Sequence, residues 1–163
     1  MDSTVWATGV QIGNSDLNLL KAPSRRTGSL KKETTQAIVE GLKEAGINFV
    51  VYMPDSFFYD VITTIEKDPD FSSISVPNES VGMCLCAGAW LGGKKPVMIM
   101  ENTGLFVASN ALTRFHQPFD IPVLMLISYR GDAGDGWWMI IDIGHAFEPA
   151  LKSFGITYEL VDN

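Results

Sequence analysis

Apolar residues recur with two periods along the chain, one typical of buried strands and one typical of amphipathic helices. Five apolar runs have the length of strands: INFVVYMP (47–54), FSSISV (71–76), PVMIM (96–100), IPVLMLISY (121–129) and ITYELV (156–161). Segments with helical spacing precede and separate these runs. The first helical segment begins at Ser29 and stops at Gly46, directly before the first run. Strands and helices therefore alternate along most of the chain.

This alternation predicts an α/β fold: a single doubly wound domain with a mostly parallel sheet of five or six strands and right-handed crossovers. PVMIM is almost continuously apolar, as expected for a strand that helices cover on both faces of the sheet. Residues 1–28 have no clear period and are interpreted as an N-terminal extension. Residues 29–163 form the predicted domain, because 163 residues suffice for one hydrophobic core.

The helix expected after the second strand is unusual because most of its residues are small. These residues are Gly82, Cys84, Cys86, Ala87, Gly88, Ala89, Gly92 and Gly93. A glycine inside a helix costs roughly 1 kcal/mol relative to alanine, so we expect close packing against a broad surface as compensation. The two cysteines lack the further ligands of a structural zinc site and are expected to be buried thiols.

Composition and charge restrict the function. The formal net charge of -7 disfavours binding to nucleic acid or to an anionic membrane surface, since both favour basic patches. No apolar run approaches the roughly 20 residues of a membrane-spanning helix. The first thirty positions lack the apolar core of a secretory signal. We therefore expect a cytoplasmic globular protein.

Polar residues follow the predicted strands at their carboxyl ends, the edge where open α/β sheets bind ligands. Asp55 and Ser56 follow the first strand, and they are also suited to cap the next helix. Asn78 and Glu79 follow the second strand, where Asn78 can cap the helix that begins with Glu79. A glutamate at a helix start can also serve only to stabilise the helix dipole.

Several short motifs, in consistent order from about residue 29 to residue 161, carry a resemblance to a known family. They are PDS (54–56), NES (78–80), GKKPV (93–97), ENTG (101–104), NALT (110–113), IPVLMLISYRG (121–131) and His145. In this order they resemble the pyrimidine-binding domain of thiamine diphosphate-dependent 2-keto acid decarboxylases, which include sulfopyruvate and phosphonopyruvate decarboxylases.

The resemblance implies a catalytic role for Glu79. The glutamate at this place in the family forms a hydrogen bond with a ring nitrogen of the cofactor's aminopyrimidine. Sharing this proton favours the imino tautomer, which deprotonates the thiazolium, and the resulting ylid attacks a 2-keto acid. Because proton sharing requires a carboxyl group that holds its proton, we expect Glu79 to be desolvated at a subunit interface.

The resemblance also implies roles for polar residues near Glu79. Asp55 and Ser56 would face the substrate or the thiazolium, as an alternative to helix capping. Asn102 and Thr103 would line the pocket and form hydrogen bonds with a keto acid. The expected cofactor-binding residues are Glu79, Pro54, Asn102, Thr103 and Gly104. Glu101 stands where the family usually has glutamine, and its carboxylate would repel an anionic substrate.

Two residues are candidates for binding an anionic substrate group, because arginine offers a planar fork of donors. These are Arg130 and His145, for which a structural ion pair and packing on a helix are the alternatives. Arg114 and His116 are weaker candidates for the same role and are expected simply to face solvent. The apolar loop Trp137–Ile141 is too large to be exposed without a purpose. It would close over the active site, where it would favour a more apolar 2-keto acid, or dock on a partner.

Magnesium is expected on another chain. Gly134–Asp135–Gly136 followed by Asp162–Asn163 is similar to the magnesium motif of thiamine enzymes, but the other motifs assign this segment to the pyrimidine domain. The resemblance thus implies a beta-type subunit that binds Mg²⁺ and the diphosphate, in a dimer or higher hetero-oligomer. A carboligase subunit and a non-catalytic assembly subunit remain alternatives, as does a piece of a longer fused chain.

Overall fold

Four parallel strands form one sheet in the computed structural model of the chain, which describes residues 30–131 and 138–161. The strands are β1 (Phe49–Tyr52), β2 (Ser72–Ser75), β3 (Pro96–Glu101) and β4 (Leu124–Ser128), in the spatial order β2-β1-β3-β4. The α-helices are α1 (Lys32–Glu44), α2 (Tyr59–Ile65), α3 (Glu79–Leu91), α4 (Thr103–Ala111) and α5 (Ile141–Ser153). A π-helical turn, η2 (Leu112–His116), extends α4, and a short 3-10 helix, η3 (Trp138–Ile140), precedes α5.

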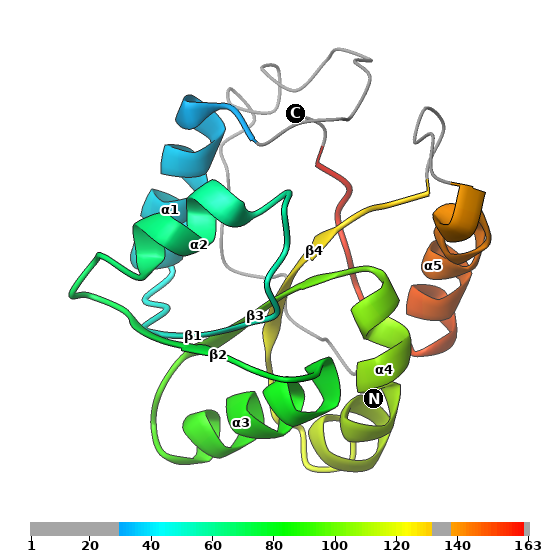
Figure 1. Cartoon of the computed structure of the whole chain (residues 1–163). Helices are drawn as coiled ribbons and strands as arrows, with labels where there is room; N and C mark the ends of the chain where they lie inside the picture. Colours follow the sequence, from blue (N-terminus) through cyan, green and yellow to red (C-terminus); the bar gives the residue numbers. More distant parts are fainter. Residues whose placement is uncertain (1–29, 132–137, 162–163) are drawn as a thin grey trace.

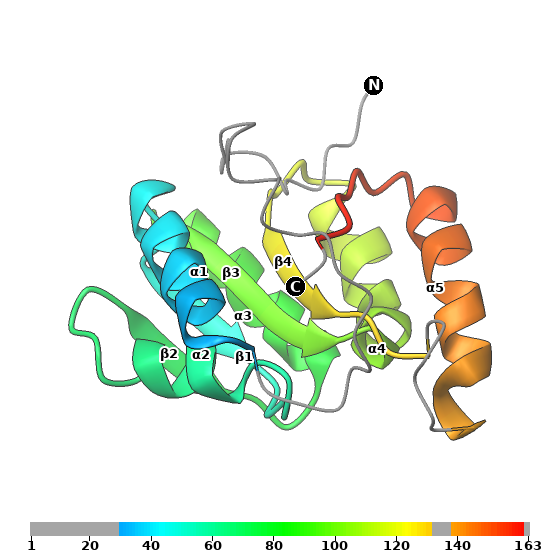
Figure 2. The ribbon, with the colours of Figure 1, turned by 90° about the horizontal axis from the view of Figure 1, so that it is seen from above.

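Helices cover both faces of the sheet, as predicted (Figures 1 and 2). Val50 and Val97 point to one face, where they join a hydrophobic core with residues of α1 and α2. Val51 and Met98 point to the other face and join a core with residues of α3, α4 and α5. Successive strand residues alternate between the two cores because strand side chains have a period of two. The doubly wound α/β fold is confirmed.

The predicted fifth strand is wrong, so the sheet has four strands among the described residues rather than five or six. Residues 156–161 form no strand pairing. Instead, Ile156 is buried in the core beside α5, and the Tyr158 hydroxyl donates to Glu148 Oε2 over 2.5 Å. The apolar residues of this segment therefore hold it to the domain through side-chain contacts, without backbone hydrogen bonds to a neighbouring strand.

Helix α3 packs closely on the sheet through its small residues. A Cβ atom at Gly82 would lie 2.7 Å from Met98 Cε and 3.2 Å from Val76 Cγ2, so only glycine fits without displacing them. Cys86 is buried, as predicted, and burial raises the pKa of its thiol to about 12. Cys84 is exposed, so the prediction that both thiols are buried is wrong for this residue. No described helix has the length and apolar character to cross a membrane.

His116 does not face solvent, contrary to expectation. Its side chain is 2% exposed, with Nδ1 3.0 Å from the Ile121 carbonyl oxygen and Nε2 2.8 Å from the Met83 carbonyl oxygen. Arg114, in contrast, is exposed on the same π-helical turn. The imidazole thus connects α3 with the segment that leads into β4.

Replacing His116 by phenylalanine is expected to lower the free energy of unfolding by about 1–3 kcal/mol, because a buried carbonyl oxygen loses the imidazole N–H as its donor. Urea unfolding of the full chain measures this change. The matched control is Arg114→Gln, an exposed substitution in the same turn, for which a change within about 0.5 kcal/mol is expected. Equal effects of the two substitutions would contradict the bridging role of His116.

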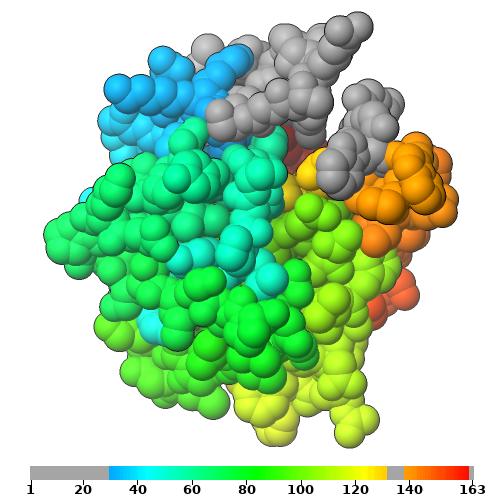
Figure 3. All heavy atoms as spheres, in the orientation of Figure 1, coloured from blue at the N-terminus to red at the C-terminus, as the bar shows by residue number. Residues whose placement is uncertain are grey.

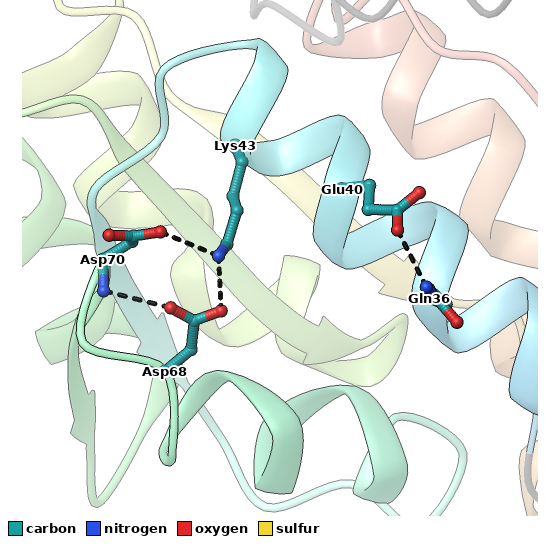
Figure 4. Close-up of polar contacts among 5 residues, drawn as sticks. All are labelled: Gln36, Glu40, Lys43, Asp68 and Asp70. Carbon is teal, nitrogen blue, oxygen red and sulfur yellow. Dashed lines mark hydrogen bonds and ion pairs between the residues drawn. The ribbon is translucent and has the colours of Figure 1, made fainter.

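A salt-bridge cluster joins α1 to the turn that follows α2 (Figure 4). Lys43 Nζ lies 2.6 Å from Asp68 Oδ2 and 2.8 Å from Asp70 Oδ2. The Asp68 hydrogen bond is the main reason why the pKa of Lys43 is raised, and Lys43 in turn lowers the pKa of Asp68. Because β2 begins directly after this turn, the cluster lies at the amino edge of the sheet, opposite to the carboxyl edge.

Candidate active site

The carboxyl ends of β1 and β3 meet where the winding direction of the sheet reverses. The chain passes outward from β1 to β2 and then returns across β1 to β3. Ligands of doubly wound α/β proteins bind at such switch points. Asp55 follows β1, Glu101 ends β3, and Arg130 follows β4, so polar residues predicted from separate motifs share this edge.

Glu79 is the first residue of α3 and lies against the first turn of α4. The Asn78 side chain caps α3, as predicted, by accepting a hydrogen bond from the Val81 N–H over 2.9 Å. The half-buried Glu79 side chain packs on Gly104, where an added Cβ atom would lie 2.6 Å from Glu79 Cγ and 2.8 Å from its Oε1. Gly104 therefore provides the space that the glutamate occupies.

Two helix ends surround the Glu79 carboxyl group. It belongs to the first turn of α3 and touches the first turn of α4, and both turns carry the positive end of a helix dipole. Each such end stabilises a nearby negative charge by about 0.3–1 kcal/mol. Because both helix ends favour the negatively charged form, the position is suited to a carboxyl group that accepts a hydrogen bond from a ligand.

Asp55 braces the carboxyl ends of β1 and β4. Its Oδ1 accepts from the Phe57 N–H over 2.8 Å, and its Oδ2 accepts from the Ser128 hydroxyl. Helix α2 begins only at Tyr59 and has no side-chain cap, so capping by Asp55 or Ser56 is wrong. The two flanking residues of the turn, Pro54 and Ser56, are exposed at this edge.

Asn102 is fully buried at the end of β3. Its Nδ2 donates to the Arg130 carbonyl oxygen over 2.8 Å, and its backbone N–H donates to the Ser128 carbonyl oxygen over 3.0 Å. Its Oδ1 has no hydrogen-bond partner in the described part of the chain. A buried acceptor without a donor is uncommon and costs about 1–3 kcal/mol, so this oxygen is available for a ligand donor.

Glu101 and Arg130 form an ion pair, which is one of the two alternatives considered for the arginine. Glu101 Oε2 lies 3.7 Å from Arg130 Nη1, and Glu101 Oε1 accepts from the Thr103 hydroxyl over 3.1 Å. The side chains of Glu101 and Arg130 are 30% and 25% exposed. The guanidinium that was expected to bind an anionic substrate group is therefore partly neutralised by a neighbouring carboxylate.

Exposed apolar side chains gather at the start of α5, next to the exposed carboxylate of Asp142. His145 is exposed on α5, and its substrate-binding role stays a prediction. The exposed fractions of Trp138, Met139 and Ile141 are 78%, 60% and 38%. These three residues start a helical segment rather than a loop. Trp137, Gly134–Gly136 and Asp162–Asn163 lie outside the described residues.

Two features of the site were missed in the sequence. Ser128, the partner of Asp55, lies within an apolar run and gave no signal. The second feature is a surface that we call the α3–α4 face, composed of exposed apolar residues of the two helices, Val81, Leu85, Leu91, Phe106 and Val107. The sequence does indicate this face, because Glu79 is the only charged residue of α3 and the helix therefore has no charged side to face solvent. In Figure 3 both helices, green and yellow-green, form adjoining parts of the visible surface.

The fold and these features define a class of protein: a doubly wound α/β domain with a carboxyl group at its switch point, next to an uncovered apolar face. No family model matches the sequence. Individual relatives do match. The chain is 31% identical, over 76% of its length, to the sulfopyruvate decarboxylase subunit alpha of Methanococcus maripaludis, 74% of which is covered. The identity to the corresponding subunit of Methanocaldococcus jannaschii is 35%, over 71% of this chain and 68% of that one.

The chain therefore belongs to the family of the sulfopyruvate decarboxylase alpha subunits. It is also 33% identical, over 60% of its length, to the phosphonopyruvate decarboxylase of Streptomyces viridochromogenes, of which the match covers 25%. The resemblance inferred from the short motifs is confirmed.

Proposed function

We propose that this chain is an alpha-type subunit of a thiamine diphosphate-dependent decarboxylase that acts on a 2-keto acid, and that a beta-type subunit completes its active site. The observation that carries the proposal is the Glu79 carboxyl group, held at the switch point against Gly104. The family supports it, because the relatives are named as decarboxylases and as alpha subunits.

The residues at this edge fit the aminopyrimidine of thiamine diphosphate, a flat ring with both donors and acceptors. Glu79 offers a carboxyl group to a ring nitrogen, and the buried Oδ1 of Asn102 has no donor among the described residues. Gly104 keeps the place of the glutamate free of a side chain. The bound cofactor supplies a thiazolium that stores the electron pair when carbon dioxide leaves.

Within this chain, the proposed role of Glu79 is to hold a proton at its carboxyl oxygen and share it with the ring nitrogen. Sharing requires exclusion of water, because solvation favours the carboxylate. Glu79 is only half-buried in the isolated chain. We propose that the contact with this subunit extends from the α3–α4 face over the first turns of α3 and α4, where it would also bury the Glu79 carboxyl group.

The occupant that we assign to the α3–α4 face is the beta-type subunit, with the ligands for Mg²⁺ and the diphosphate. An α-helix with apolar residues on all sides is normally buried, yet one side of α3 is exposed here. The sulfopyruvate decarboxylase of Methanosarcina acetivorans, which is not named as a subunit, offers support: the match, at 28% identity, covers 32% of that protein.

Replacing Leu85 by glutamate is expected to weaken binding of the beta-type subunit at least 30-fold, about 2 kcal/mol, because a charge would enter the apolar centre of the contact. Sedimentation of the two purified subunits measures the dissociation constant. The matched control is Ala37→Glu, which places the same charge on the exposed side of α1. An unchanged dissociation constant for the Leu85 variant would remove the α3–α4 face from the interface.

The proposed function is tested with the chain coexpressed and purified with its beta-type subunit. We expect carbon dioxide release from a 2-keto acid only when both subunits, thiamine diphosphate and Mg²⁺ are present. Analysis of the products for acyloins separates decarboxylation from carboligation. Absence of turnover for every 2-keto acid, in a complex that binds the cofactor, would refute the proposed enzyme.

A further inference from the structure

The candidate site carries more negative than positive charge among its described residues. Asp55, Glu79 and Glu101 contribute three carboxyl groups, and Arg130 contributes the guanidinium group. This guanidinium lies 3.7 Å from the Glu101 carboxylate. Any additional anion that approaches Arg130 therefore also approaches Glu101.

The ion pair affects which 2-keto acid this edge accepts. Arginine binds sulfonate, phosphonate and carboxylate groups through a planar fork of donors, and this fork is most effective when no carboxylate competes for it. Because Glu101 competes, a substrate with a second anionic group is disfavoured relative to one with a single carboxylate. The two side chains are only 30% and 25% exposed, so water screens this effect less than it would on an open surface.

A segment with exposed apolar side chains lies beside Gly131, the residue that follows this arginine. Gly131 follows Arg130 and touches the end of η3, since a Cβ atom at Gly131 would lie 2.0 Å from the Ile140 carbonyl oxygen. The Tyr129 hydroxyl donates to the Gly144 carbonyl oxygen over 3.1 Å and holds α5 to the end of β4. These contacts place η3, with the exposed side chains of Trp138 and Met139, beside the carboxyl end of β4.

We propose that this site selects 2-keto acids whose side chain is uncharged and apolar. Glu101 discriminates against a second anionic group by pairing with Arg130, and Trp138 and Met139 contact the apolar end of the substrate. The inference rests on the proposed function and adds its substrate class. It differs from what the names of the relatives state, because those proteins are named for sulfonate and phosphonate substrates.

The first experiment compares kcat/KM for sulfopyruvate, phosphonopyruvate, 4-methyl-2-oxopentanoate and phenylpyruvate in the assembled complex. We expect at least one apolar substrate to exceed both dianionic ones by about tenfold or more, the scale at which one group in a pocket discriminates. A preference for sulfopyruvate or phosphonopyruvate would overturn the inference but leave the proposed function intact. Absence of turnover for all four would overturn both.

The second experiment replaces Glu101 by glutamine, which keeps the shape of the side chain and its acceptor for Thr103. We expect the ratio of kcat/KM for sulfopyruvate to that for the preferred apolar substrate to rise about tenfold, because Arg130 loses its competing carboxylate. Glu40→Gln is the matched control, since it removes the same charge from the exposed side of α1. An unchanged ratio in the Glu101 variant would overturn the role of the ion pair.

The third experiment replaces Trp138 by alanine. We expect kcat/KM for phenylpyruvate to fall about tenfold while kcat/KM for pyruvate, which is too short to reach the tryptophan, changes less than twofold. The dissociation constant of the two subunits is measured in parallel. Weaker subunit binding with an unchanged substrate ratio would overturn the inference and assign Trp138 to the subunit contact instead.

Discussion

Replacing Glu79 by glutamine is expected to lower kcat for decarboxylation by about 10²–10⁴-fold, the usual contribution of a positioned proton-transfer group. Glutamine has nearly the same size, so it can still occupy the space over Gly104 and preserve the packing of α3 on α4. It cannot exchange a proton with a ring nitrogen, however. The loss should therefore appear in turnover and not in the stability of the chain. Steady-state kinetics of the assembled complex and thermal unfolding measure these two quantities.

The matched control for this variant is again Glu40→Gln, which changes the net charge equally and lies on α1, away from the carboxyl edge. If the Glu79 variant retained nearly full turnover, the catalytic assignment would fail and a role in assembly alone would gain support. If it failed to bind the beta-type subunit, the kinetic result would be repeated with subunit concentrations above the measured dissociation constant.

Replacing Gly104 by alanine is expected to reduce kcat by about 10²-fold, although the alanine itself carries no chemistry. The new Cβ atom would lie 2.6 Å from Glu79 Cγ and 3.0 Å from Cδ, distances that force the carboxyl group to move. A displacement of about 1 Å at a catalytic group typically costs this factor. The measurement is the same steady-state assay of the assembled complex.

The Gly104 prediction has a control that separates positioning from general damage. If the alanine acts by displacing Glu79, it should cause little further loss in a chain that already carries Glu79→Gln, because the two residues then act as one unit. Independent, multiplicative losses in the double variant would show that Gly104 has another role. Thermal unfolding of each variant identifies any loss of fold.

Much of the architecture could be predicted because its causes are local. Four of the five apolar runs contain strands. Asn78 caps α3 by a hydrogen bond with a residue only three positions away in the sequence. The prediction of a fifth strand is wrong because Ile156 is buried without strand pairing and Tyr158 forms a side-chain hydrogen bond, yet both residues fit the pattern of a paired strand. Period alone does not distinguish these two causes, since a ladder depends on the neighbour across the sheet.

Burial of individual polar side chains was harder to predict. His116 was expected in solvent and is enclosed by two carbonyl groups, one on α3 and one before β4. The sequence allows Arg130 either to bind a substrate or to form an ion pair, and the nearby Glu101 carboxylate shows the ion pair. In both cases the contacting groups belong to other segments of the chain, so the sequence around His116 and Arg130 does not predict these contacts.

By itself, the sequence determined the order of strands and helices, the placement of Glu79 at a helix start and the membership of a decarboxylase family. Only the tertiary structure decided which distant residues share the carboxyl edge: Glu79 with Gly104, Glu101 with Arg130, and Asp55 with Ser128, 73 residues apart. The physical reason is the strand order β2-β1-β3-β4, which is set by how the two hydrophobic cores close over the sheet. Local periodicity specifies each element, but the cores specify which elements become neighbours.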